Sequence, residues 1–238
     1  MSIGKTAQQT FIENVVRFSN RSPLSNGAKD VLDDLAQLHF NLLSQIAPLA
    51  YPNGAVWVDP MFLVELNKYR GHAALWNDLQ QLAVELSHLI RSSAPFTDLL
   101  GDAICGAVSE QKATALGQFF TPPQLAATLL QFLEPSEAQT LRVGDPCCGA
   151  GALALAQLAD LLKSGGKEAI AGVHVVLNDK DPGMAKLAAA QVGLSALFHG
   201  IPLGGLDVHC GDVIADYLND TLILHIAPDA EKRMPEAG

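Results

Sequence analysis

Three carboxylates and one glycine-containing turn are the residues of this chain whose types and spacing could do chemistry. Asp145 ends a short apolar run and opens the sequence Asp-Pro-Cys-Cys-Gly-Ala-Gly, while Asp179 and Asp212 follow two later apolar runs. Glycine lets a backbone turn approach a ligand closely, and the N-terminus of a following helix favours polar or negative groups. A carboxylate at the end of the next strand is placed to bind the two hydroxyls of a ribose. The pattern indicates a pocket for a nucleotide-like ligand.

Structural roles are the alternative for the same residues. Many α/β turns carry two glycines without binding a ligand, so the turn by itself has low specificity. Asp181 stands before Pro182, a pair typical of a helix N-cap and the first helical residue. Asp179 keeps both interpretations, a ribose ligand or a solvated turn residue.

Apolar runs that alternate with Ala-rich segments from residue 139 onward predict a parallel α/β sheet. Four strands are expected, at residues 141–144, 173–177, 206–210 and 221–226. Helices are expected between them at residues 152–163 and 183–193, and the Ser-Gly-Gly sequence at 164–166 is a natural helix stop. The glycine turn then lies between the first of these strands and the first of these helices.

Helical spacing of apolar residues dominates the first half of the chain. Helices are expected over residues 6–18, 28–49 and 72–90, with one more that ends near residue 112. Residues 57–66 are ambiguous, and one option is a helix that starts at Asp59-Pro60. We therefore divide the chain into a helical N-terminal region, residues 1–115, and a second region, residues 116–238.

Bulk composition limits the classes of function. The 238 residues are 49% hydrophobic and 17% charged, and the net charge is −10. An acidic chain holds nucleic acid weakly through charge, so DNA binding would need a local patch or a partner that supplies the charge. No apolar run reaches the roughly 18 residues of a membrane span, no signal peptide is evident, and neither cysteines nor histidines have metal-binding spacing. We expect a cytoplasmic protein with no membrane contact and no metal site.

A second motif, Gly-Gln-Phe-Phe-Thr-Pro at residues 117–122, precedes the glycine turn, and an apolar-periodic segment at 123–133 lies between them. The order of these features resembles that of the N6-adenine DNA methyltransferases: the two motifs come first, and Asp179 and Gly211-Asp212 follow them. The resemblance covers about residues 96–213 and is greatest to the methylase subunits of type I restriction-modification systems. It implies an α/β chain in which a helical N-terminal region precedes a partial Rossmann-like methyltransferase sheet.

The resemblance further implies an S-adenosylmethionine pocket. One group of residues would flank the methionine end of the cofactor: Phe119, Phe120, Thr121 and Pro122. Asp145 and the turn with Cys147, Gly149 and Gly151 would hold the amino-acid portion.

The same resemblance assigns the nucleoside part of the pocket. Asp179 would bind the ribose hydroxyls, Lys180 would lie against the adenine, and Asp212 would accept a hydrogen bond from the adenine amino group. Lys180 departs from the apolar residue that is common at its position.

The family's fourth strand is followed by an Asn/Asp-Pro-Pro-aromatic tetrad. Its polar residue accepts hydrogen bonds from the target amino group, and its aromatic ring stacks on the flipped-out base. In this chain the strand expected at 221–226 runs into Ala227-Pro228-Asp229-Ala230. If these residues align with the tetrad, Ala227 lacks the acceptor, Ala230 lacks the ring, and Asp229 is displaced by two positions. The resemblance then implies a chain truncated after its fourth strand, which binds the cofactor without independent catalysis.

Several functions remain open at this point. The chain could be an active adenine methyltransferase subunit completed by a partner chain, a non-catalytic regulatory or anti-restriction decoy subunit, or a degenerate fragment with neither role. DNA would be reached through a partner subunit, with other restriction-modification subunits as candidate partners. A chain that ends at its fourth strand leaves residues 221–226 at a sheet edge, so we expect homodimerisation or another association there, or C-terminal residues folded over that edge.

Overall fold

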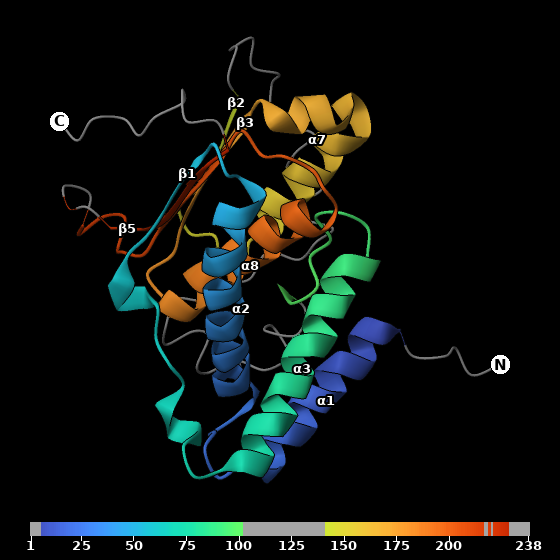
Figure 1. Cartoon of the computed structure of the whole chain (residues 1–238), viewed down its shortest axis with the longest axis vertical. Helices are drawn as coiled ribbons and strands as arrows, with labels where there is room; N and C mark the ends of the chain where they lie inside the picture. Colours follow the sequence, from blue (N-terminus) through green and yellow to red (C-terminus); the bar gives the residue numbers. More distant parts are fainter. Residues whose placement is uncertain (1–5, 102–140, 217–218, 220, 229–238) are drawn as a thin grey trace.

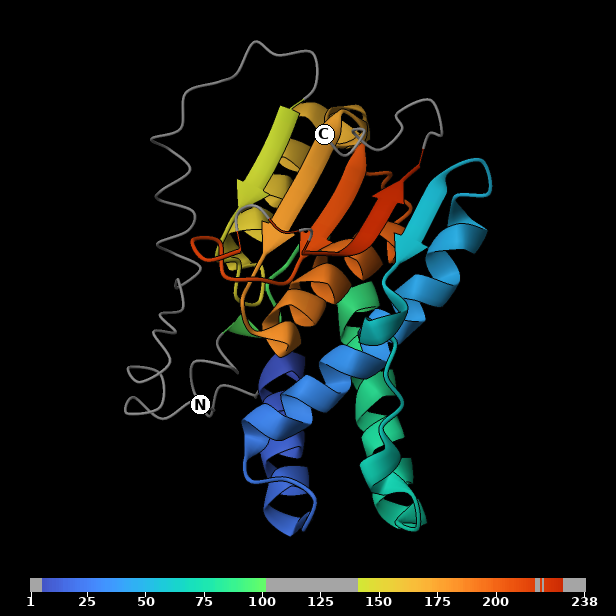
Figure 2. The ribbon, with the colours of Figure 1, turned by 90° about the vertical axis from the view of Figure 1, so that its left-hand side faces the viewer.

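The computed structural model describes residues 6–101, 141–216, 219 and 221–228. Within these residues a five-stranded sheet in the order β1-β5-β4-β3-β2 packs against helices (Figure 1). Figure 2 shows the sheet at the top of the molecule, with α1 and α3 extending below it. The expected α/β class, with a helical N-terminal region before a partial Rossmann-like sheet, is confirmed.

Three neighbouring strands run parallel: β2 (Leu141–Asp145), β3 (Val173–Asn178) and β4 (Gly205–His209). All three were expected within a residue of these bounds. The register pairs Asp145 with Leu177, and Asn178 with His209. The carboxyl ends of the three strands therefore meet at one edge of the sheet, as the sequence predicted for the residues that follow them.

The fourth expected strand exists as β5 (Leu222–Ala227), but it is antiparallel to β4. Parallel neighbours usually need a long, often helical crossover, whereas the short connection of residues 210–221 returns the chain in the opposite direction. The other side of β5 pairs with β1 (Ala55–Val58), which comes from the N-terminal region. The prediction that residues 221–226 form an edge strand is wrong, because β5 has a paired strand on each side. The structure therefore gives no support to the association predicted through that strand.

The ambiguous segment 57–66 holds both the end of β1 and a short 3₁₀ helix, η1 (Pro60–Phe62). Asp59 caps this helix by accepting a hydrogen bond from the Met61 N–H at 2.9 Å. The predicted helix start at Asp59-Pro60 is therefore confirmed, although the helix is a single turn. A second 3₁₀ helix, η2 (Asn67–Tyr69), follows before α3.

The expected helices are confirmed, with somewhat longer bounds. They are α1 (Ala7–Arg21), α2 (Ala28–Ala50), α3 (Ala73–Ser92), α7 (Ala152–Ala171) and α8 (Pro182–Phe198). The stop expected at 164–166 is a kink instead: Gly166 has a φ of +69°, and helical structure resumes after it. The helices expected near residue 112 and at 123–133 lie outside the described residues.

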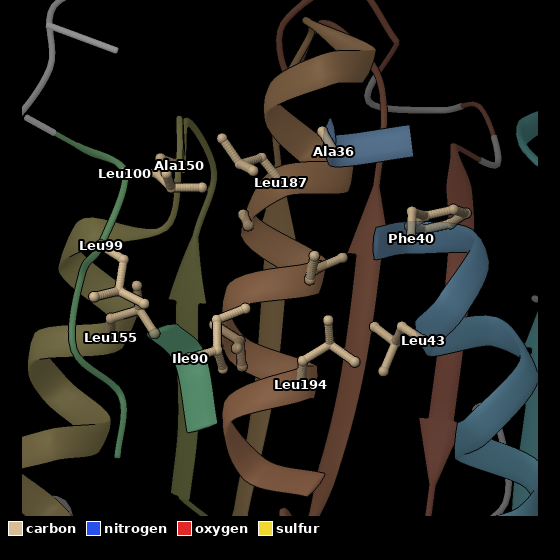
Figure 3. Close-up of a cluster of buried hydrophobic side chains, with 14 of the residues drawn as sticks. Ala36, Phe40, Leu43, Ile90, Leu99, Leu100, Ala150, Leu155, Leu187 and Leu194 are labelled. Carbon is tan, nitrogen blue, oxygen red and sulfur yellow. The ribbon is translucent and has the colours of Figure 1, made fainter. Parts of the chain in front are cut away.

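Helix α8 lies at the centre of the core, between the sheet and α2. Figure 3 shows Leu43 of α2 facing Leu194 of α8, with Leu155 of α7 on the other side of α8. The N-terminal helices and the sheet therefore share one hydrophobic core. The proposed boundary between residues 115 and 116 lies outside the described residues.

A polar cluster crosses three strands of the sheet. Asp207 of β4 lies 2.7 Å from Nε2 of His174 on β3 and 2.6 Å from Nδ1 of His225 on β5. Burial raises the pKa of Asp207, but the hydrogen bonds and charges of the two histidines outweigh burial and hold the pKa well below its usual range. The carboxylate is therefore stabilised in its ionised form.

We expect Asp207→Asn to lower the free energy of unfolding by about 2 kcal/mol at pH 7, because two charge-assisted hydrogen bonds are weakened. A depressed folded-state pKa gives stability that is present above the unfolded pKa of about 4 and is lost as pH falls through the folded pKa. In urea unfolding between about pH 2 and pH 7, the difference between parent and variant should shrink below about pH 4. A difference independent of pH would contradict this assignment.

Candidate functional site

The turn after β2 brings a buried carboxylate to the start of α7. Asp145 accepts a hydrogen bond from the Cys147 N–H at 3.3 Å, and the Gly151 N–H closes the turn on the Cys148 carbonyl at 2.7 Å. Gly149 and Gly151 have φ values of +53° and +92°, in the left-handed region that glycine adopts without steric cost. A Cβ on Gly151 would also lie 3.3 Å from the Cβ of Ala188 on α8. The two glycines thus let the turn fit closely against α8.

Asp179, just after β3, is bonded to this turn. Its Oδ2 accepts from the Gly149 N–H at 2.8 Å, and its Oδ1 accepts from the Asp181 N–H at 2.9 Å. Asp179 is partly exposed to solvent. A carboxylate offers about four acceptor sites, so these two bonds orient Asp179 and leave capacity for two further donors.

Negative charge accumulates around the turn. Burial raises the pKa of Asp145, and the nearby charge of Asp179 raises it further. Burial also raises the pKa of the Cys148 thiol well above its usual value, with Asp179 and Asp145 as further causes. A positively charged ligand group beside Asp179 would offset the negative charge that helps burial to raise the pKa of Asp145.

Asn178, the last residue of β3, forms hydrogen bonds with the loops that follow β2 and β4. Its Nδ2 donates to the Pro146 carbonyl at 2.9 Å and to the Gly211 carbonyl at 3.0 Å. Its own carbonyl accepts from the Cys148 N–H at 2.8 Å. Sequence reasoning missed this residue, and the available signal was a carboxamide at a strand end beside Asp179.

The loop after β4 is folded by its own carboxylate. Asp212 Oδ1 accepts from the N–H groups of Ile214 and Ala215, at 2.9 and 3.1 Å. These backbone hydrogen bonds lower the pKa of Asp212, and the charge of Lys180 contributes to the same shift. Both Asp212 and Lys180 are exposed at the edge of the sheet that carries Asp179. The structure thus brings these two predicted nucleoside residues near each other.

Asp181 caps α8, as predicted, by accepting from the N–H groups of Gly183 at 2.8 Å and Met184 at 3.4 Å. Further along α8, the buried Gln191 links this helix to two segments. Its Oε1 accepts from the Leu99 N–H at 3.0 Å, while its Nε2 donates to the Ala150 carbonyl at 2.8 Å and to Asp98 Oδ1 at 3.3 Å. Gln191, which sequence reasoning missed, thus holds the glycine turn and residues 98–99 together.

The structure does not bring Ala227 to this site. Because β5 is antiparallel to β4, Ala227 lies at the opposite end of the sheet from Asp145 and Asp179, paired with Ala55 of β1. The interpretation of residues 227–230 as the position of a catalytic tetrad therefore rested on a parallel strand that the structure does not contain in its described part. Asp229 and Ala230 lie outside the described residues, and so do Phe119, Phe120, Thr121 and Pro122 of the earlier motif.

Two further findings concern the described residues as a set. None of their helices is long and apolar enough to cross a bilayer. Their His, Cys, Asp and Glu side chains form no group of three or more arranged for a metal ion.

Comparison with known proteins places this site in a family. No curated protein matches the chain. The family model described as N-6 DNA Methylase matches residues 96–222, more than half of the 238 residues. The matched segment contains the glycine turn, Asp179 and Asp212, and it ends where β5 begins. The chain therefore belongs to the N-6 DNA methylase family.

Proposed function

We propose that this chain binds S-adenosylmethionine at the carboxyl ends of β2, β3 and β4, as the methyl donor for DNA adenine-N6 methylation. The observation that carries the proposal is the carboxylate of Asp179, fixed on the glycine turn by the Gly149 N–H at 2.8 Å. Membership of the N-6 DNA methylase family supports the same reaction class. When bound, the cofactor supplies an electrophilic methyl group.

The residues present fit such a ligand in three respects. Gly149 and Gly151 fold the turn with positive φ values, and Gly149 is partly exposed where its N–H meets Asp179. Asp179 retains acceptor capacity for a pair of hydroxyls. Asp145 and Asp179 suit a ligand with ammonium and sulfonium groups, because burial and the nearby charge of Asp179 both raise the pKa of Asp145, and positive groups would offset that charge.

Each part of the pocket then has a proposed role. Asp145 and the turn that contains Cys147, Gly149 and Gly151 would orient the amino-acid portion. Asp179 would accept the ribose hydroxyls, Lys180 would lie along the adenine, and Asp212 would accept from the adenine amino group. The motif of Phe119, Phe120, Thr121 and Pro122 would complete the methionine end.

We do not propose that this chain transfers a methyl group without a partner. No Asn/Asp-Pro-Pro-aromatic tetrad occurs anywhere in the 238 residues. Without such a tetrad, the chain supplies neither the acceptor for the target amino group nor the ring that stacks on the flipped base. A partner chain that carries the tetrad would complete an active adenine methyltransferase, whereas a complex without one would give this chain a regulatory or decoy role in restriction-modification.

Calorimetric titration with S-adenosylmethionine tests the proposal directly. We expect saturable binding with one site per chain, whereas absence of heat at concentrations up to about 1 mM would overturn it. Transfer of a tritiated methyl group to adenine-containing DNA, with and without partner subunits, separates the functional alternatives. Incorporation by the isolated chain would contradict the proposed lack of independent catalysis.

The cysteines of the turn give a second test. Cys147 is exposed and Cys148 is buried, so a maleimide should label the first much faster than the second. At a cofactor concentration of ten times Kd, about nine-tenths of the sites are filled, so labelling of Cys147 should slow about tenfold. Peptide mapping by mass spectrometry assigns the labelled thiol, and Cys147→Ser is the matched control. An unchanged labelling rate at saturation would place the ligand elsewhere.

A further inference from the structure

A lysine of the N-terminal region reaches the helix that follows the proposed ribose carboxylate. Lys29, in the first turn of α2, places its Nζ 2.7 Å from Asp33 Oδ1 and 3.1 Å from Asp181 Oδ2. The side chains of Lys29 and Asp181 are each 22% exposed, so this ion pair is shielded from most solvent screening. It therefore connects α2 to the first turn of α8.

The ion pair is one link of a continuous path to the glycine turn. Asp181 caps α8 with Oδ1 and uses Oδ2 for Lys29. The backbone N–H of Asp181 donates to Asp179 Oδ1 at 2.9 Å, and Asp179 Oδ2 accepts from Gly149 at 2.8 Å. Movement of Asp181 would thus change the orientation of the Asp179 carboxylate.

Charge and packing both hold this path in place. Burial lowers the pKa of Lys29, but the hydrogen bond and the charge of Asp33, together with Asp181, outweigh burial, and the pKa is raised. Burial raises the pKa of Asp181, but Lys29 and the capped N–H groups bring it below its usual value. A Cβ at Gly183 would lie 2.3 Å from Asp33 Oδ1, which shows how closely α2 approaches the start of α8.

We propose that Lys29 is a positioning residue for Asp179, so that the N-terminal helical region helps to determine affinity for the ribose diol. The proposal rests on the proposed function, because it concerns the same cofactor site. Among the described residues, Lys29 bonds to Asp33 and Asp181 and to none of the proposed cofactor ligands. It acts by fixing Asp181, whose N–H orients the carboxylate that accepts the two hydroxyls.

The experiment compares two ligands, S-adenosylhomocysteine and its 2′-deoxyribose analogue, by calorimetry. The parent protein should prefer the ribose ligand. Lys29→Met should weaken the ribose ligand about tenfold, equivalent to ~1.4 kcal/mol, and the deoxy ligand at most about twofold. Lys29→Arg should retain parental affinity within about threefold, because it can still pair with Asp181. Lys167→Met is the matched control, since Lys167 bonds to the His199 and Gly200 carbonyls after the far end of α8.

Each failure has a distinct meaning. A parent protein that binds neither ligand would refute the proposed function itself. A parent that prefers ribose, with Lys29→Met unchanged, would overturn only the role of Lys29. Equal weakening of both ligands by Lys29→Met would show a merely structural role and would also overturn the proposal. If Lys29→Met does not fold, Asp181→Asn, which keeps a capping oxygen but removes the charge, must show the same selective loss or the proposal fails.

Discussion

Replacing Asp179 with alanine is expected to weaken S-adenosylmethionine binding by at least about a hundredfold, below the level that calorimetry detects readily. The substitution removes the acceptor for both ribose hydroxyls. It also removes the acceptor for the Gly149 N–H. In the parent protein this hydrogen bond, 2.8 Å long, holds the glycine turn against Asp179. Each lost hydrogen bond to a charged group is worth about 1.5–3 kcal/mol, so the combined loss exceeds the ~2.7 kcal/mol of a hundredfold change.

Two companion variants separate the role of charge from that of shape. Asp179→Asn keeps one acceptor oxygen, so it should weaken binding by a smaller factor, about tenfold. Asp160→Ala removes an exposed carboxylate of α7 and should leave affinity unchanged. Urea unfolding of every variant establishes that the protein is folded. Parental affinity in Asp179→Ala would show that the ligand does not use this carboxylate.

The positions of Asp145 and Asp179 at one edge of the sheet could be predicted from the sequence for a simple reason. The strands at 141–145 and 173–178 are separated by a helix of ordinary length, a pattern that produces parallel neighbours. Carboxyl ends of parallel neighbours then lie side by side, so residues that follow the strands meet whatever their sequence separation. Local periodicity was sufficient for this part of the fold.

The pairing of β1 with β5 could not be predicted in the same way. Ala55–Val58 is a four-residue strand, too short for a recognisable period, and its partner lies well over a hundred residues later. The short connection from β4 sets the direction of β5, but its second neighbour, β1, is brought to it by contacts between distant parts of the chain. The parallel strand expected from the family therefore gave the wrong position for Ala227, which ends an antiparallel strand.

The side chains that support the site escaped prediction for another reason. Helix α8 is apolar on nearly all sides, so its polar residues do not mark a solvent face. Gln191 and Ser195 lie one turn apart and are both buried, each bonded to the backbone of residues 96–99. A polar side chain inside an otherwise buried helix was the available signal, but its partners come from a distant segment.

Gln191→Leu is expected to lower the free energy of unfolding by about 3 kcal/mol. Leucine is of similar size, so little cavity is created, but the Leu99 N–H and the Ala150 carbonyl would lose their partners. An unsatisfied buried polar group costs about 1–3 kcal/mol, and the gain from burying a more apolar side chain offsets only part of two such losses. Denaturant unfolding, followed by circular dichroism, measures the difference.

Two controls define what Gln191 contributes. Ser195→Ala removes the acceptor of a single bond, that of the Phe96 N–H at 2.7 Å, and should cost about 1–2 kcal/mol. Gln80→Leu changes an exposed glutamine of α3 and should stay within about 0.5 kcal/mol of the parent. Because Ala150 belongs to the glycine turn, Gln191→Leu should also weaken the cofactor under conditions where the protein remains folded. A variant as stable as the parent would mean that the two backbone groups find other partners, and that the turn does not depend on α8 through Gln191.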